Sequence, residues 1–320
     1  MVKFNEGASL NTSQISDQRG SGGGFGGGGG GLGGIPIGRA GGGIGLLVTL
    51  VFVAIQLFGG KFGGGGDAAP AGSGLLQQAA ATGGSVDTGA LADKCKTGAQ
   101  ANTDDDCRVV GFINSVQDYW ANQFQKSGKT YTESMTVYYS GQTQTGCGMG
   151  SKDMGPFYCP ADKQVYIDLS FWQTLKSTFG TNGGVFAEGY VLAHEYGHHI
   201  QDLLGTSDQV STAKGEKSGS VRLELQADCY AGVWAKNATT TPGPDGKILI
   251  SEITPQDIND ALDTASKIGD DYIQKNIGGG GYDPSQNTHG TSAQREKWLN
   301  TGYKSGDPAS CDTFGAKDLG

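Results

Sequence analysis

The stretch VLAHEYGHHIQ, residues 191–201, carries three of the four histidines in this chain of 320 residues. No proline interrupts it, and Glu195 is its only charged residue when histidine is counted as neutral. Residues four apart on a helix lie on the same face, so His194 and His198 can bind one ion together. Glu195 lies at the rim of that face, within reach of a water on the ion. The spacing HExxH therefore predicts a helix that provides two zinc ligands and a general base.

A catalytic zinc site needs a third protein ligand and keeps one position open for water. The metzincin pattern is excluded, because Gln201 and Leu204 stand where it requires glycine and histidine. Asp208, in GTSDQVST, matches only half of the aspzincin motif. Glu224, in ELQAD, fits the gluzincin arrangement, with Asp228 four residues later on the same helix face. We favour Glu224 over Asp208 as the third ligand, and we expect Asp228 to hold the far nitrogen of a ligand histidine.

The two remaining histidines receive different interpretations. His199 is rotated by about 100° from His198 around the helix, so we interpret it as a residue that packs or supports the ligands. His289 lies in a glycine-rich segment, just before a helix that Thr291 and Gln294 are expected to cap. Amide hydrolysis builds negative charge on the carbonyl oxygen, which a positioned imidazole stabilises. His289 is therefore a candidate catalytic residue beside Glu195, and a surface histidine is the alternative.

Hydrophobic patterns around these motifs predict an α+β domain, with a small sheet followed mostly by helices. The predicted elements are helices over 108–128, 186–204 and 220–238, helices opening at Pro255 and after Thr291, and strands over 135–141 and 163–171. The stretch QVYIDL, residues 164–169, is expected to offer a sheet edge to an extended peptide.

The chain before residue 95 has a different composition. It contains half of the 58 glycines, and about half of the residues in 20–66 are glycine. Such a segment buries too little apolar surface to offset its ordering entropy. We predict a disordered glycine-rich cytoplasmic segment over 1–43, a flexible linker over 61–94 and a folded domain over 95–320.

An uncharged apolar stretch, Ile44–Phe58, interrupts the glycine-rich region. With its glycine flanks it reaches about twenty residues, enough for a helix to span a bilayer. It predicts one transmembrane helix, a signal anchor over 44–60. Three basic residues precede the span and only Lys61 follows it closely, so the positive-inside rule places the N-terminus in the cytoplasm and the domain outside.

All six cysteines follow the apolar stretch, which fits an oxidising compartment. Fifteen pairings are possible. Closeness in sequence favours Cys95–Cys107 and Cys147–Cys159, which leaves Cys229–Cys311; the alternative is that some cysteines are free or bind metal. No CxxC motif is present, which argues against a zinc ribbon. The net charge of −9, without a strong basic patch, argues against a nucleic-acid partner.

Several stretches together resemble one known family. They are the first twenty residues, the apolar span, GPFYCPADKQVYIDLSFW, VLAHEYGHHIQ, LELQADCYAGVWA and THGTSAQREKWLNTGYKSGDPASCDTF. The chain is similar to the bacterial neutral zinc metallopeptidase family of the YpfJ type over nearly its whole length, except that its glycine-rich leader is longer. The resemblance implies His194, His198 and Glu224 as zinc ligands and Glu195 as the base. It also implies a bacterial source and an extracytoplasmic, zincin-like domain.

These observations lead to a first hypothesis, a zinc-dependent (Zn²⁺) endopeptidase acting on protein or peptide substrates. It would be a single-pass protein of the bacterial inner (cytoplasmic) membrane, with its domain periplasmic or extracellular. One alternative is a non-catalytic envelope protein, in which a fourth protein ligand closes a structural zinc site. The other is a zinc hydrolase that acts on cell-wall peptides.

Overall fold

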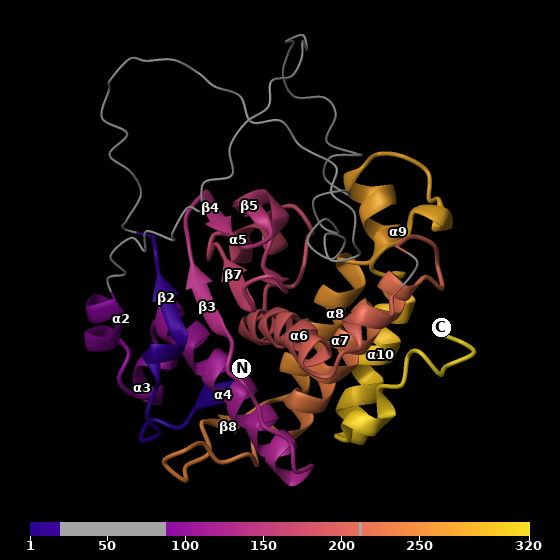
Figure 1. Cartoon of the computed structure of the whole chain (residues 1–320). Helices are drawn as coiled ribbons and strands as arrows, with labels where there is room; N and C mark the ends of the chain where they lie inside the picture. Colours follow the sequence, from indigo (N-terminus) through magenta and orange to yellow (C-terminus); the bar gives the residue numbers. More distant parts are fainter. Residues whose placement is uncertain (20–87, 211–212) are drawn as a thin grey trace, which may run out of the picture.

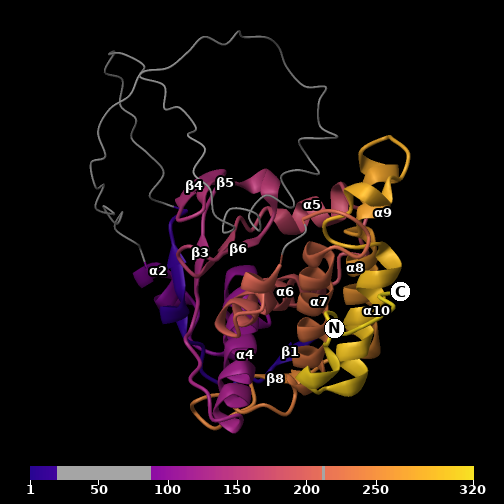
Figure 2. The ribbon, with the colours of Figure 1, turned by 45° about the vertical axis from the view of Figure 1, so that its right-hand side comes forward.

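A mixed sheet lies beside a group of helices in the computed structural model (Figures 1 and 2), which describes residues 1–19, 88–210 and 213–320. The strands run in the order β2 (Ile15–Asp17), β3 (Met135–Tyr138), β7 (Gln164–Ile167) and β6 (Phe157–Cys159). The first three are mutually parallel, and β6 is antiparallel to β7. A hairpin of β4 (Gln142–Thr145) and β5 (Gly148–Ser151) precedes β6. The chain therefore has the predicted α+β fold.

The edge strand beside the HExxH helix is β6, so the prediction that QVYIDL forms an edge is wrong. That stretch forms β7, which is hydrogen-bonded to β3 on one side and to β6 on the other. Gly155 and Pro156 precede Phe157–Cys159 and Pro160 follows it, a composition that is typical of a loop. Backbone pairing with β7 and a disulfide at Cys159 hold this short segment as a strand instead.

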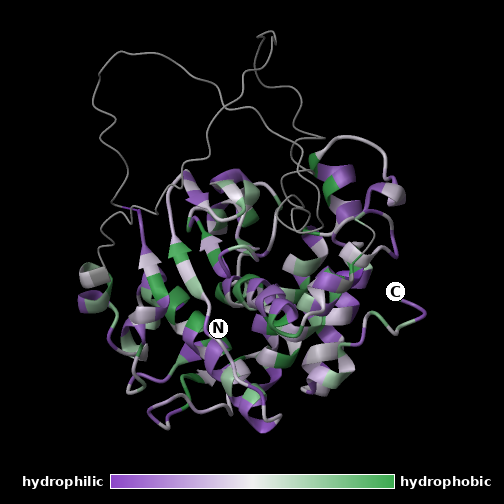
Figure 3. Cartoon of the chain, in the orientation of Figure 1, coloured by the Kyte–Doolittle hydropathy of each residue, from purple (hydrophilic) through white to green (hydrophobic). Residues whose placement is uncertain are grey.

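Helices make up most of the remaining structure, and in Figure 3 they carry both hydrophilic and hydrophobic colour. They are α2 (Thr88–Lys94), α3 (Gly98–Ala101), α4 (Asp105–Lys126), α5 (Phe171–Ser177), α6 (Val185–Leu203), α7 (Gly219–Asn237), α8 (Pro255–Lys267), α9 (Asp270–Tyr272) and α10 (Ser292–Ser305). The predicted long helices are confirmed as α4, α6 and α7. The expected starts of α8 and α10 are also confirmed, each with a capping box.

The predicted disulfide pairing is confirmed in full, with bonds Cys95–Cys107, Cys147–Cys159 and Cys229–Cys311. The third bond closes the longest loop, with a sequence separation of 82 residues, and ties the C-terminal segment to α7. Closing a loop of this length removes conformational freedom from the unfolded chain and stabilises the fold by about 4 kcal/mol in the chain-entropy model.

The first nineteen residues belong to the folded domain, so the prediction of disorder is wrong for them. They contain β1 (Lys3–Phe4), which pairs antiparallel with β8 (Ile250–Glu252), and β2 at the edge of the main sheet. Four of their apolar side chains are buried, namely Val2, Phe4, Ala8 and Ile15. The glycine-rich stretch begins only at Gly20. The prediction of disorder was wrongly extended from that stretch to residues 1–19, which are not rich in glycine.

Two further predictions concern the start of the folded domain and the apolar stretch. Helix α2 begins at Thr88 and buries Leu91 in the core, so the folded part starts before Cys95. The predicted membrane span over 44–60 lies outside the described residues. Within the described ranges, no helix is both long and apolar enough to cross a membrane.

Replacement of Phe4 by alanine tests whether the first residues are part of the core. The Phe4 ring is 3% exposed and packs edge-on against Phe112, with ring centroids 5.1 Å apart. We expect Phe4→Ala to lower the free energy of unfolding by about 3–5 kcal/mol, measured by urea denaturation. The matched control Lys3→Ala removes only an exposed ion pair and should cost no more than about 1 kcal/mol. Equal effects of the two variants would show that Phe4 is not a core residue.

Candidate metal centre

The candidate site lies where α6 and α7 pack closely together. A Cβ atom added at Gly197 of α6 would lie 2.9 Å from the Cα of Ala227 of α7, a distance that real Cβ atoms essentially never show. Only glycine permits this approach. It brings His194 and His198, on one face of α6, next to Glu224 on α7.

The three predicted ligands converge on one point. His194 Nε2 lies 3.1 Å from Glu224 Oε2, and His198 Nε2 lies 3.5 Å from Glu224 Oε1. One donor atom from each residue fits within a group no wider than 4.8 Å. Tetrahedral ligands at about 2.0–2.1 Å from zinc lie about 3.3 Å from one another, so these separations suit a single zinc ion.

Each ligand histidine is held at its second nitrogen. His194 Nδ1 donates to Asp228 Oδ1 at 2.8 Å, as expected for Asp228. His198 Nδ1 donates to the side-chain oxygen of Gln201 at 2.9 Å. The Gln201 amide in turn donates to the carbonyl of Leu223 at 2.7 Å. Both Nδ1 atoms are therefore committed, and both Nε2 atoms are directed at the ion position.

Arg295 of α10 completes the support of His194. Its guanidinium binds both carboxylate oxygens of Asp228, with Nε to Oδ2 at 2.8 Å and Nη2 to Oδ1 at 2.9 Å. Tyr190 donates its hydroxyl proton to the same Oδ1 at 2.7 Å. The side chains in this group are all buried, namely those of Arg295, Asp228, His194 and Tyr190. Asp228 is thus fixed as a hydrogen-bond acceptor and cannot rotate away from the histidine.

Charges inside the site favour an ionised Glu224. Burial alone would raise the pKa of this carboxyl, but His198, His289 and His194 together hold it well below its usual range. Burial opposes protonation of His194, whereas Asp228 and Glu224 raise its pKa to about 10. Because a metal binds the neutral imidazole, zinc competes with a proton for His194 Nε2.

Glu195 lies beside the ion position, and its pKa is perturbed. Its side chain is buried at 9% exposure, and this burial, reinforced by the negative charge of Glu224, raises its pKa to about 7. The charge of His194 and a hydrogen bond from the backbone of Tyr158 act in the opposite direction. A carboxyl with a pKa near neutrality both accepts and releases a proton at physiological pH.

His289 is buried, so the alternative of a surface histidine is wrong. Its Nδ1 lies 3.3 Å from Asp270 Oδ1 and 2.9 Å from the Thr288 hydroxyl. Asp270 Oδ2 also accepts the backbone N–H groups of Thr288, His289 and Gly290 at 2.7–2.8 Å. Glu224 and Asp270 outweigh burial and raise the pKa of His289. Asp270 therefore holds the loop at residues 288–290 in place. The charge of the candidate ligand Glu224 acts on the imidazole of His289.

Two other residues considered from the sequence lie outside the ligand group. His199 is fully buried, donates from Nε2 to the carbonyl of Thr132 at 2.7 Å, and places Nδ1 3.1 Å from the Tyr158 hydroxyl. It therefore packs α6 against β6, in line with its predicted supporting role. Asp208 is exposed in a short 3₁₀ helix and is not a member of the group.

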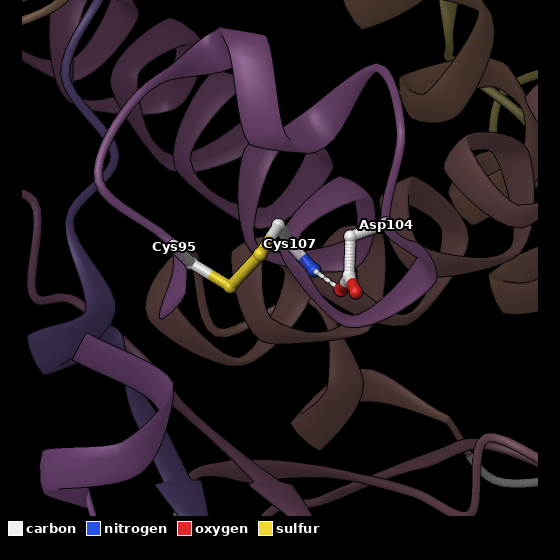
Figure 4. A group of neighbouring side chains, drawn as sticks. All are labelled: Cys95, Asp104 and Cys107. Atoms are coloured by element: carbon white, nitrogen blue, oxygen red, sulfur yellow. Dashed lines mark hydrogen bonds between the residues drawn. A yellow bond between two sulfur atoms is a disulfide. The ribbon is translucent and has the colours of Figure 1, made fainter. Parts of the chain in front are cut away.

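A second cluster of metal-binding residue types, Cys95, Asp104 and Cys107, is shown in Figure 4. The two sulfur atoms are joined in a disulfide, so neither is available as a thiolate ligand. Asp104 is the N-cap of α4, and its Oδ1 accepts the backbone N–H of Cys107. This cluster fixes the start of a helix and has no metal-binding role.

Two histidines and a glutamate gathered around one point form a group of donor atoms of the kind that holds a zinc ion. The chain belongs to the family described as "putative neutral zinc metallopeptidase", whose sequence profile matches residues 7–314. The family name implies zinc, and the geometry of the donor atoms fits that metal.

Relatives of the chain occur in several bacteria. It is 47% identical over 248 residues to uncharacterized proteins of Mycobacterium tuberculosis and Mycobacterium bovis, covering 77% of this chain and 83% of each relative. It is 45% identical over 221 residues to the uncharacterized protein YpfJ of Escherichia coli, covering 67% of this chain and 73% of that protein. No solved structure matches the chain, so the zincin-like fold remains a prediction.

Replacement of Arg295 tests whether it positions a ligand. We expect Arg295→Met to weaken zinc binding about 10- to 100-fold, because Asp228 loses the partner that orients it toward His194. Zinc affinity is measured by competition with a chromogenic chelator, and circular dichroism checks folding. The matched control is Arg108→Met, which breaks the ion pair with Glu188 and should leave zinc affinity unchanged. Equal zinc affinity in the Arg295 variant and the wild type would contradict the positioning role.

Proposed function

We propose that this protein is a zinc-dependent endopeptidase in which His194, His198 and Glu224 hold the metal and Glu195 is the general base. One observation carries the proposal. Hydrogen bonds fix the Nδ1 atoms of His194 and His198 and the carboxylate of Asp228. Glu195 is buried beside the ligands, without an ion-pair partner in the described part of the chain. The family assignment supports the same function.

Zinc, when bound, supplies a Lewis acid that lowers the pKa of a water and polarises the scissile carbonyl. The protein side chains then move the protons. Glu195 accepts a proton from the attacking water and donates it to the leaving amine. Burial raises the pKa of Glu195 to about 7 in the metal-free site, which favours proton uptake by this carboxylate.

His289 is the proposed stabiliser of the negative charge that develops on the scissile carbonyl oxygen. With Nδ1 committed to Asp270 and Thr288, Nε2 is the nitrogen available to donate a hydrogen bond to the substrate. The raised pKa of His289 favours the protonated form, which is the better donor. Asp270 acts as a positioning residue through this contact.

Strand β6 is the proposed binding edge for an extended peptide. One of its sides pairs with β7, and it is the last strand of its sheet. Its central residue, Tyr158, lies close enough to Glu195 for its backbone to lower the pKa of that carboxyl. A peptide that added to the free side of β6 by strand pairing would pass beside the base.

An extracytoplasmic location of the domain is part of the proposal. Three disulfides connect all six cysteines in the described residues, and such bonds persist in oxidising compartments. A structural zinc site would place a fourth protein ligand on the ion. The group found among the described residues has three members, which favours the open, catalytic arrangement.

The Glu195→Gln variant tests the enzyme assignment. We expect zinc content equal to that of the wild type and a loss of casein or peptide-library cleavage of at least about 10²–10⁴-fold, because the variant cannot accept the proton of water. Zinc is measured by elemental analysis of the same preparations. Equal cleavage by the variant and the wild type would overturn the assignment.

The third ligand is tested by two alanine variants. Glu224→Ala removes a carboxylate that faces both ligand histidines, so we expect zinc content to fall to near zero. Asp208→Ala removes an exposed carboxylate outside the group and should leave zinc content unchanged. Zinc loss in the Asp208 variant alone would assign the site to the aspzincin arrangement instead.

A further inference from the structure

We propose that residues 1–19, the N-terminal arm, dock permanently on the domain of the same chain, so that the arm and the domain occupy one compartment. This inference does not depend on peptidase activity. It rests on contacts between the arm and residues 88–320. The arm precedes the apolar stretch 44–58 in the sequence, and residues 88–320 follow it.

Two glycines of the domain make room for the arm. A Cβ atom added at Gly98 would lie 2.1 Å from the backbone oxygen of Asn5. One added at Gly111 of α4 would lie 2.6 Å from the Phe4 ring. Both distances are too short for any larger residue unless the arm moves. The domain surface is therefore shaped to accept the arm at these two points.

Two asparagines of the domain pair with the arm as a neighbouring strand would. Asn102 accepts the backbone N–H of Phe4 at 2.8 Å and donates to its carbonyl at 2.9 Å. Asn114 does the same for Asn11, at 2.8 and 2.9 Å. Asn114 is only 3% exposed, and it also donates to Gln14 at 2.7 Å. Without the arm this amide would lose all of these partners, which is costly for a polar group in a buried position.

Two short stretches of backbone pairing hold the arm, one near its start and one near its end. Strand β1 pairs with β8, and β2 adds to β3 in parallel, with Ile15 opposite Thr136. Arg19, the last described residue of the arm, binds Asp106 of α4 at 2.7 Å. The first residues are also held, because the backbone N–H of Val2 donates to Asp257 at 3.0 Å.

These contacts have a consequence for topology. A single membrane crossing between residues 19 and 88 would place the arm and the domain on opposite sides of the bilayer. In that arrangement none of the arm contacts could form within one chain. The contacts therefore favour both parts on the same side, in place of the predicted orientation with a cytoplasmic N-terminus and an external domain. Together with the three disulfides, they place the arm in the oxidising compartment as well.

A zero-length cross-link in intact cells tests the proposal on the full wild-type chain. Lys3 Nζ lies 2.5 Å from Glu252 Oε2, and both side chains are partly exposed. A membrane-permeant carbodiimide should join them by an amide bond, which mass spectrometry of the digested protein detects. Lys94 and Asp104, 2.8 Å apart and both in the domain, provide the internal positive control. We expect the two links to form in comparable yield, in the monomer band of a denaturing gel.

The matched variant Glu252→Gln should lose the link to Lys3 and keep the link between Lys94 and Asp104. Absence of the Lys3–Glu252 link in wild-type cells that form the control link would overturn the proposal. A Lys3–Glu252 link found only in a dimer band would also overturn it, because the arm would then dock on a second copy. Failure of the peptidase assay would leave this result unaffected.

Discussion

The carboxylate of Asp228 is the interaction on which the site depends. It is fully buried, and it binds the imidazole of His194, the hydroxyl of Tyr190 and the guanidinium of Arg295. Burial favours the neutral acid, but Arg295 and His194 lower the pKa of Asp228 to about 2. The charge is retained because three donors, from α6 and α10, compensate it. A buried carboxylate with fewer donors would be strongly destabilising.

The backbone explains how Arg295 reaches this position. Helices α7 and α10 touch through two glycines. An added Cβ would lie 2.1 Å from the carbonyl oxygen of Leu299 at Gly232, and 2.0 Å from that of Cys229 at Gly302. With Gly197 between α6 and α7, three helices thus meet at glycine contacts around the ligands. Such close packing leaves the polar side chains few alternative conformations, which favours a preorganised site.

Local spacing in the sequence predicted the parts of the site that lie on one helix, and it failed for parts brought together by packing. His194, Glu195 and His198 follow from helix periodicity, and Glu224 with Asp228 follows from a second local motif. Gln201 lies three residues after His198 and was detectable by the same rule. Arg295 lies 67 residues after Asp228, and Asp270 lies 19 residues before His289, so no spacing rule connects either pair. The edge strand β6 was missed for a related reason, since its pairing with β7 outweighs its turn-rich composition.

The N-terminal region contains two kinds of segment, the folded arm and the glycine-rich stretch that follows it. Through α4, the arm is also linked to the helices that carry the candidate metal ligands. Phe4 packs on Phe112 of α4, and Phe112 in turn contacts Phe186 of α6 and Trp234 of α7, with centroids 6.1 and 6.3 Å apart. These two helices carry the ligands. Removal of the arm would uncover Phe112 and Gly111 of α4, which now contact the Phe4 ring. Phe112 therefore joins the arm, through direct ring contacts, to both helices that carry the candidate ligands.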